Sequence, residues 1–298
     1  MRSLLACSAL LLLPLSALAA DAPNCKFTAA RTLKLETSGA KAVVFEVNQH
    51  DLKVVASKGG GQLDGRACAS SQEWLDQLVL DQRKEGDKLV VSLRREGRDS
   101  GISLGSSYAW LDIRGSVPDN LPLQLKVGSG DASVDNAQSL SVDVGSGDAI
   151  IRGTRGTRGS IHAAVGSGDL DIDGGSSLNL LSLGSGDVKA RNIGGDAVTG
   201  TVGSGDLKLS DVRGNARLDT VGSGDVGFKR VQGNVDVGVV GSGDVDLSDI
   251  GGNVHVRSHG SGDIQVDGVR GSLTVDHSGS GDVGHRNVSG TVTLPRKK

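Results

Sequence analysis

The tetrapeptide Gly-Ser-Gly-Asp occurs nine times in the second half of this 298-residue chain, at a nearly constant spacing. The copies begin at Gly128, Gly145, Gly166, Gly184, Gly203, Gly222, Gly241, Gly260 and Gly279. Successive copies are 17, 21, 18, 19, 19, 19, 19 and 19 residues apart. A period near 20 residues is typical of repeat architectures, in which each unit buries its apolar face only against its neighbours. The sequence therefore predicts a stacked array.

The last five repeats align without gaps, and their apolar residues alternate with polar ones. When the first glycine of each motif is position 1, apolar residues occupy positions 5, 7, 10, 14 and 16, apart from His285 at position 7, and position 12 is always glycine. Alternation with a period of two, mostly in β-branched residues, is typical of strands with one buried face. Each repeat is predicted to hold two short strands, joined by Gly-rich corners that tolerate positive φ angles.

These features predict an all-β fold, namely a single-chain β-solenoid (a parallel β-helix), expected to be right-handed, with about nine regular 19-residue coils. Coils stacked at the strand spacing of about 4.8 Å would form a rod roughly 40 Å long. The aromatic content of 2% agrees with a thin core of Val, Leu and Ile. The repeat pattern leaves open whether each coil has two or three sides.

The chain is expected to divide into three segments. Residues 1–20 resemble a secretory signal peptide, with Arg2, an apolar run from Leu4 to Leu18 and a small-residue cleavage site at Ala17-Leu18-Ala19. Residues 21–127 are predicted to be an irregular N-terminal β region that caps the solenoid, and residues 128–298 are the repeats. No later segment is apolar enough to span a bilayer, so the mature chain is expected to leave the cytoplasm.

The N-terminal β region contains several weaker signals. Strands are predicted at 43–47, 52–55, 89–93 and 108–114, and a polar loop is predicted at 97–107. The sequence Ser70-Ser71-Gln72-Glu73 resembles a capping box and predicts one short helix that continues through Leu78. An array with an open end would expose unpaired backbone groups, so an atypical terminal unit is expected to act as a cap.

Two cysteines remain after removal of the leader. Cys25 and Cys68 are predicted to form a structural disulfide, because the chain is expected to reach an oxidising compartment. The bond would close a loop of 43 residues at the N-terminal end of the solenoid.

The aspartates at position 4 are the strongest candidates for chemistry. In stacked coils they would form a column of carboxylates about 4.8 Å apart, which repel by roughly 1 kcal/mol in water. Asp206, Asp225, Asp244 and Asp263 are the weak candidates for metal ligands, in the manner of Ca²⁺-binding β-rolls, but Ca²⁺ needs several oxygens for each ion. The favoured interpretation is structural, with each carboxylate accepting backbone N–H groups at its corner. No cofactor is predicted.

Catalytic motifs and a nucleic-acid partner are not indicated. Gly101-Ile102-Ser103-Leu104-Gly105 matches a nucleophile elbow, but no strand precedes it and no helix follows it. The 32 lysine and arginine residues are outnumbered by 35 aspartate and glutamate residues, which argues against nucleic-acid binding. Residues 152–159 hold three arginines in a longer coil, and a solvated basic loop is favoured there over an anion site.

One stretch gives a specific resemblance. The series Leu111-Asp112-Ile113-Arg114, Val117-Pro118 and Leu121-Pro122-Leu123, followed by Gly-Ser-Gly-Asp coils, is similar to the bacterial putative adhesin families, including the head-GIN-domain proteins. This resemblance covers about residues 108–298. It implies an exported β-solenoid, and it assigns no catalytic or ligand residue.

The leading hypothesis is therefore an exported, non-enzymatic β-solenoid that serves as an adhesin or as a structural or interaction module of the bacterial cell envelope. It is expected in the periplasm or at the cell surface, where its partner would be an envelope or surface ligand, either protein or glycan. Two alternatives remain open: a Ca²⁺-dependent repeat module, and a β-helix enzyme that acts on polysaccharides.

Overall fold

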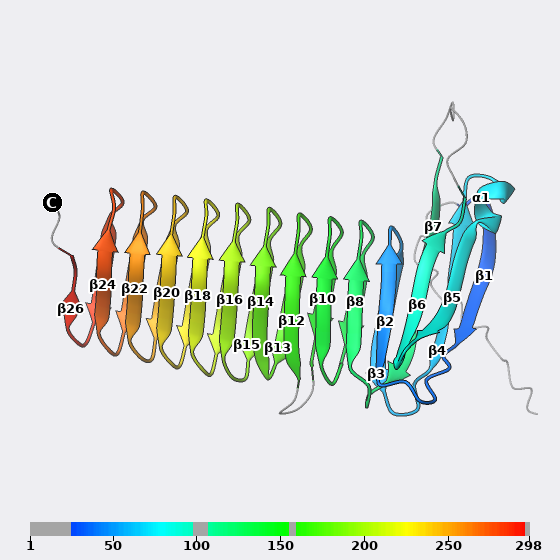
Figure 1. Cartoon of the computed structure of the whole chain (residues 1–298), viewed down its shortest axis with the longest axis horizontal. Helices are drawn as coiled ribbons and strands as arrows, with labels where there is room; N and C mark the ends of the chain where they lie inside the picture. Colours follow the sequence, from blue (N-terminus) through cyan, green and yellow to red (C-terminus); the bar gives the residue numbers. More distant parts are fainter. Residues whose placement is uncertain (1–24, 98–106, 155–158, 296–298) are drawn as a thin grey trace, which may run out of the picture.

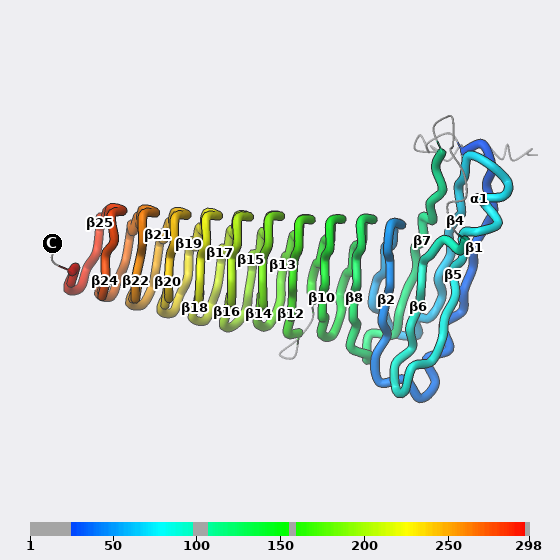
Figure 2. Tube along the Cα trace, turned by 45° about the horizontal axis from the view of Figure 1, so that its top comes forward, coloured from blue at the N-terminus to red at the C-terminus, as the bar shows by residue number. Residues whose placement is uncertain are grey.

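The computed structural model describes residues 25–97, 107–154 and 159–295, which form an elongated rod built from two facing 13-stranded sheets (Figures 1 and 2). The predicted signal peptide and most of the predicted 97–107 loop, with Ser103, lie outside the described residues. Within the described part of the chain, no helix has the length and apolar character needed to cross a bilayer.

Sheet A consists, in spatial order, of β1 (Phe27–Lys34), β4 (Gln62–Ala69), β7 (Ala109–Pro118), β3 (Asp51–Ser57), β9 (Ala132–Asp135), β11 (Ala149–Arg152), β13 (Leu170–Gly175), β15 (Val188–Ile193), β17 (Leu207–Val212), β19 (Val226–Val231), β21 (Val245–Ile250), β23 (Ile264–Val269) and β25 (Val283–Val288). Sheet B consists of β5 (Leu78–Glu85), β6 (Lys88–Arg95), β2 (Ala42–Asn48), β8 (Leu123–Val127), β10 (Leu140–Val144), β12 (Ser160–Val165), β14 (Ser177–Leu183), β16 (Ala197–Val202), β18 (Ala216–Val221), β20 (Val235–Val240), β22 (Val254–His259), β24 (Leu273–Ser278) and β26 (Val292–Thr293).

Each Gly-Ser-Gly-Asp corner, here called the first corner, joins a strand of sheet B to the next strand of sheet A. Like strands pair in parallel with residues 19 apart, as in Val226↔Val245 and Val235↔Val254. The predicted β-solenoid of about nine stacked coils is confirmed, and each coil has two sides. In Figures 1 and 2 the chain rises through sheet B and descends through sheet A as it advances, so the solenoid is right-handed.

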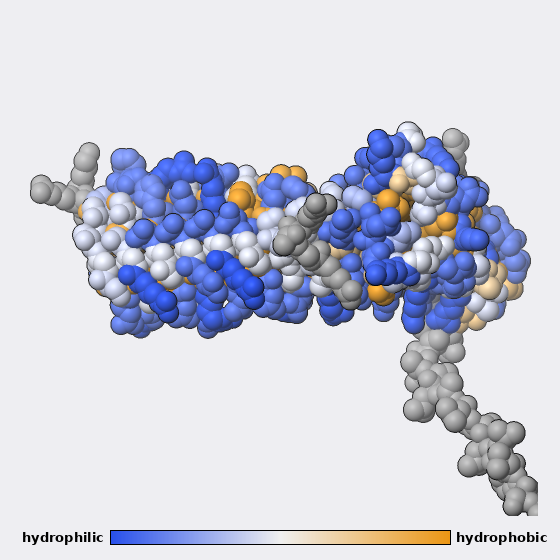
Figure 3. Space-filling model, turned by 90° about the horizontal axis from the view of Figure 1, so that it is seen from below, coloured by the Kyte–Doolittle hydropathy of each residue, from blue (hydrophilic) through white to orange (hydrophobic). Residues whose placement is uncertain are grey.

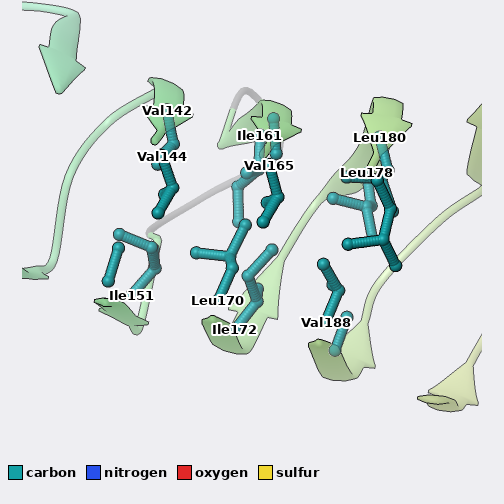
Figure 4. Close-up of a cluster of buried hydrophobic side chains, with 14 of the residues drawn as sticks. Val142, Val144, Ile151, Ile161, Val165, Leu170, Ile172, Leu178, Leu180 and Val188 are labelled. Atoms are coloured by element: carbon teal, nitrogen blue, oxygen red, sulfur yellow. The ribbon is translucent and has the colours of Figure 1, made fainter. Parts of the chain in front are cut away.

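The core lies between the two sheets, where aliphatic side chains from both sheets point toward one another (Figure 4). The apolar residues at positions 5, 7, 10, 14 and 16 of the regular coils are buried, and so is position 19, which the alternation did not predict. The pairing of sheet B skips position 17, as between Leu218↔Val237 and Thr220↔Val239. This bulge shifts the phase of the strand, so the position-19 side chains of Val221 and Val240 turn inward.

Glycine at the first corner allows adjacent coils to touch through their backbones. The amides of Ser242 and Gly243 both donate to the carbonyl oxygen of Gly222, at 2.8 and 3.1 Å. A Cβ atom on Gly243 would overlap the carbonyl oxygen of Gly224, and the same overlap recurs at position 3 of all nine motifs. Position 3 is therefore closed to any residue with a side chain.

The parallel stack also contains a coil that has no Gly-Ser-Gly-Asp motif. Strands β2 and β3 pair in parallel with β8 and β9, and the corner between them reads Asn48-Gln49-His50-Asp51. Ser129 and Gly130 donate to the carbonyl of Asn48 as later corners donate to their own predecessors. His50 fits at position 3 because the preceding layer, β6 and β7, is joined by the much longer 96–108 segment instead of a tight corner.

The outermost layers of the rod depart from the parallel pattern. Strands β1, β4 and β5 pair antiparallel, with β4 between β1 and β7 in sheet A and β5 beside β6 in sheet B. The predicted disulfide between Cys25 and Cys68 is present and holds the start of the described chain to β4.

The predicted short helix is present as α1 (Gln72–Asp76), but it begins and ends at other residues than expected. Its N-cap is Ser71, whose hydroxyl accepts the amide of Trp74. Glu73 therefore lies one residue too early to complete a capping box. Ser70 instead exchanges hydrogen bonds with Tyr108, and Leu78 already belongs to β5.

Two glycine-to-alanine substitutions test the corner contact. Gly243→Ala places a methyl group where the Gly224 carbonyl lies, so we expect the free energy of unfolding to fall by roughly 3 kcal/mol or the chain not to fold. Gly227→Ala, in β19, meets no atom within 4 Å and should change stability by less than about 0.5 kcal/mol. Urea denaturation followed by circular dichroism measures both, and equal effects would contradict the packing described here.

Buried His50 predicts a loss of stability in acid. Burial, with a smaller effect from Arg95, lowers the pKa of His50 from 6.5 to about 4. Its Nδ1 atom accepts the amide of Leu111, so the neutral ring is the form that fits. Between these pH values the unfolded chain binds a proton that the folded chain does not, so stability falls as the pH falls, by about 3 kcal/mol at most.

The variant His50→Asn keeps an acceptor for Leu111 and removes the titration. We expect its unfolding free energy to lose this dependence between pH 6.5 and 4, while His285→Asn, an exposed control, keeps it. An unchanged pH profile in His50→Asn would show that His50 is protonated equally in both states.

Candidate binding groove

Each regular strand of sheet A bends at position 9, where the backbone takes a left-handed conformation. The residues at this position are Asn136, Gly153, Gly174, Asn192, Asp211, Arg230, Asp249, Gly268 and Asn287, with φ between 54° and 92°. The pairing passes over them, for example from Ser210↔Lys229 directly to Val212↔Val231. Glycine, asparagine and aspartate are the residues that adopt this conformation most readily. The strands of sheet A are therefore turned at the same level in every coil.

A groove follows this bend along the rod, with a volume of about 1560 Å³. It is lined only by residues at positions 9, 10 and 11, contributed by eight successive coils from Thr154 to Ser289. At about 4.8 Å per coil it runs for roughly 34 Å. Figure 3 shows the rod from the side of the second corner (positions 11–13), where a pale stripe runs lengthwise between rows of hydrophilic side chains.

Ion pairs between neighbouring coils fix one wall of the groove. Arg230 binds Asp211 through two hydrogen bonds, at 2.6 and 2.7 Å. The hydrogen bond from Arg230 holds the pKa of the Asp211 carboxyl below its usual value. Near the other end, Asn287 and Arg286 both donate to Asp267. These pairs are exposed, so they position side chains more than they stabilise the fold.

Two guanidinium groups in the groove have no protein partner. The exposed side chains of Arg213 and Arg270, both at position 11, form no hydrogen bond or ion pair with the described residues. They lie three coils apart, which corresponds to about 14 Å along the rod. Gln232 and Gly251 occupy position 11 in the two coils between them, and Asp249 lines the groove at position 9. The groove therefore offers two free positive charges separated by polar and open surface.

The second corner is closed by a ladder of side-chain amides. At position 13 the backbone amide of each residue donates to the side-chain oxygen of the residue one coil earlier, as from Asn234 to Asn215 at 2.9 Å and from Asn253 to Asn234 at 2.8 Å. The ladder begins at Asp196 and continues through Ser272 to Thr291. These bonds keep positions 11–13 of neighbouring coils in register below the groove.

The candidate carboxylates form a continuous column at the first corner, away from the groove. Asp225 accepts the amide of Asp244 at 3.0 Å, and the same bond joins Asp206 to Asp225, Asp244 to Asp263 and Asp263 to Asp282. Each carboxylate thus satisfies the backbone of the coil that follows, as the structural interpretation expected. Within the described ranges, no three His, Cys, Asp or Glu side chains are grouped as metal ligands.

The column extends one step beyond the nine motifs, to Asp51 in the coil without glycine. Burial raises the pKa of Asp51, and the nearby carboxylates of Asp131 and Asp112 raise it further. The only sequence signal for this position is Asp51-Leu52-Lys53-Val54, which repeats the pattern of an aspartate followed by alternating apolar residues.

The other histidine candidates do not meet. His277 pairs with Ser258 on the exposed side of sheet B, whereas His259 is buried and its Nδ1 atom contacts the carbonyl oxygen of Gly262 at 3.2 Å. The central part of the arginine-containing loop, residues 155–158, lies outside the described residues.

Amide substitutions separate a structural column from a metal site. The double variant Asp225→Asn with Asp244→Asn keeps an oxygen for each backbone amide and removes two repelling charges, so we expect its unfolding free energy to be equal or higher. The variant with alanine at both positions loses the acceptors and should lose about 1 kcal/mol per site.

Melting of the unsubstituted chain with EDTA, and with millimolar Ca²⁺, accompanies this pair, and we expect the Tm to move by less than about 5 °C. An asparagine variant as unstable as the alanine variant, together with a Ca²⁺-dependent Tm, would identify the column as a metal site.

Solved structures similar to this chain come from several bacteria. A putative lipid binding protein from Parabacteroides distasonis is 16% identical with a TM-score of 0.38, and the match covers 90% of this chain and 98% of that one. A putative adhesin from Parabacteroides merdae is 10% identical with a TM-score of 0.37, covering 91% and 97%. A putative cell adhesion protein from Clostridium sporogenes is 12% identical with a TM-score of 0.27, covering 91% and 100%.

No curated protein matches the chain. Residues 40–234 match the family described as Toastrack DUF4097, and this match spans more than half of the chain. It includes the coil without glycine and six of the Gly-Ser-Gly-Asp corners. The chain belongs to the Toastrack DUF4097 family.

Proposed function

We propose that this chain is an exported, non-enzymatic interaction module of the bacterial cell envelope, an adhesin-like rod that binds its partner along the position-9 groove. The observation that carries the proposal is the continuity of this groove over eight coils. Pockets for small molecules measure roughly 300 to 1,000 Å³ and are compact. A groove of about 1560 Å³ that runs along a rod suits an extended chain instead.

The regularity of the rod supports binding rather than catalysis. Each coil contributes one to three residues to the groove, and no coil is set apart as a centre for chemistry. A ligand with a repeating structure would meet similar contacts in successive coils. Weak contacts that act together in this way give a much higher combined affinity than any one of them alone.

Export is supported by the leader-like residues 1–20 and by the disulfide between Cys25 and Cys68, since disulfides persist in oxidising compartments. The test is to express the full chain in a bacterium and to fractionate the cells. We expect the periplasmic or envelope fraction to contain a form that lacks the first 20 residues. A full-length chain that stays in the cytoplasm would contradict the proposal.

Blocking the groove tests the binding surface. The described chain has its two cysteines in a disulfide, so Gln232→Cys supplies a single thiol in the groove for a maleimide-linked polyethylene glycol. Gln265→Cys, on the exposed face of β23, is the matched control. The probe is envelope fragments of the producing bacterium, sedimented with the protein.

We expect the unmodified chain and the conjugate at 265 to sediment with the fragments, and the conjugate at 232 to remain in solution. Equal sedimentation of both conjugates would place the contact elsewhere on the rod, and failure of the unmodified chain to sediment would contradict an envelope partner.

A further inference from the structure

The chemistry of the groove restricts the class of chain that it can hold. Extended peptides usually bind by adding a strand to a free sheet edge or by placing apolar side chains in pockets. Neither mode is offered here, because the strands of sheet A that form the groove are paired on both sides. The apolar lining residues Val231, Ile250 and Val269 are each only 1% exposed. A ligand must therefore bind through hydrogen bonds and charge.

The polar groups of the groove are arranged for a ligand rich in hydroxyl groups. Side chains of asparagine, glutamine and serine line it together with Asp249, and they provide both donors and acceptors. The glycines Gly194, Gly251 and Gly268 leave the floor open between the larger side chains. This combination fits a sugar chain, whose hydroxyls both donate and accept.

The two free guanidinium groups add a requirement for negative charge. Arginine binds carboxylates through two parallel hydrogen bonds, and Arg213 and Arg270 are the groove arginines that have no carboxylate partner within the described chain. Arg230 is already engaged by Asp211. Asp249 lies between the two free arginines in the coil order, where it would repel an acidic group and accept a hydroxyl.

From this arrangement we infer that the groove binds an acidic polysaccharide in which uronic acid units are separated by neutral sugars. Carboxylates of the polymer pair with Arg213 and Arg270, about 14 Å apart, and neutral units between them face Gln232, Asp249 and the open floor at Gly251. The inference rests on the proposed function, since it names the ligand class for the same groove.

The test uses the full mature chain and hyaluronan oligosaccharides, which alternate glucuronate with a neutral sugar. Binding is measured by isothermal titration calorimetry at low salt and again at about 0.3 M salt. We expect binding to the unsubstituted chain that weakens with salt, because exposed charges are screened. The double variant Arg213→Gln with Arg270→Gln should bind at least tenfold more weakly.

The matched control removes two positive charges elsewhere. Arg257 and Lys208 are exposed on the outer faces of sheets B and A, and the variant Arg257→Gln with Lys208→Gln should bind hyaluronan within threefold of the unsubstituted chain. Circular dichroism should be the same for all three proteins. Equal loss in the two variants would mean that net charge, and not the groove, attracts the polymer.

Two further probes fix the ligand class. Dextran, a neutral polysaccharide, should not bind, and polyglutamate, an acidic peptide chain, should bind at least tenfold more weakly than hyaluronan. Polyglutamate binding as tight as that of hyaluronan would overturn the assignment to a sugar chain. If hyaluronan and polygalacturonate both fail to bind while envelope fragments still do, the ligand class is wrong and the proposed function stands.

Discussion

The whole rod depends on the contact between the backbones of successive coils at the first corner. Because the position-3 glycines leave no space between one coil and the carbonyl oxygen of the coil before, the coils can approach to the strand spacing at both ends of each strand. The amides of positions 2 and 3 then share one carbonyl acceptor, as Ser242 and Gly243 do with Gly222. Once this distance is set, every position of the repeat stacks on its equivalent and the apolar positions form one continuous core.

Stacking of equivalents also explains the side chains at the two corners. A backbone amide at each corner finds its acceptor in a side chain of the coil before, which is a carboxylate at position 4 and mainly an asparagine amide at position 13. The first arrangement produces a line of negative charge, and the second produces a nearly neutral line. The groove adjoins the neutral corner, so the free charges of Arg213 and Arg270 are not cancelled by the carboxylate column.

Much of the fold could be predicted from the sequence because a strict period converts directly into stacking. The repeat length gave the number of coils, and the apolar alternation identified most core positions. The burial of position 19 was missed, since the bulge at position 17 reverses the phase of the strand, and the coil at Asn48–Asp51 was missed because it contains no glycine. The groove itself could not be predicted. It follows from the left-handed bend at position 9, for which asparagine and glycine in that column were the only sign, and Arg230 departs even from that.

The parallel coils have a mechanical consequence for a molecule that is held at both ends. Hydrogen bonds between coils point along the rod, so a pulling force acts on the layers in series and can detach them one at a time from an end. One coil occupies about 4.8 Å of the rod, whereas its 19 residues extend to roughly 65 Å when pulled straight. Each coil that is released would therefore lengthen the tether more than tenfold relative to its folded share, and the remaining coils would stay intact to absorb the next load.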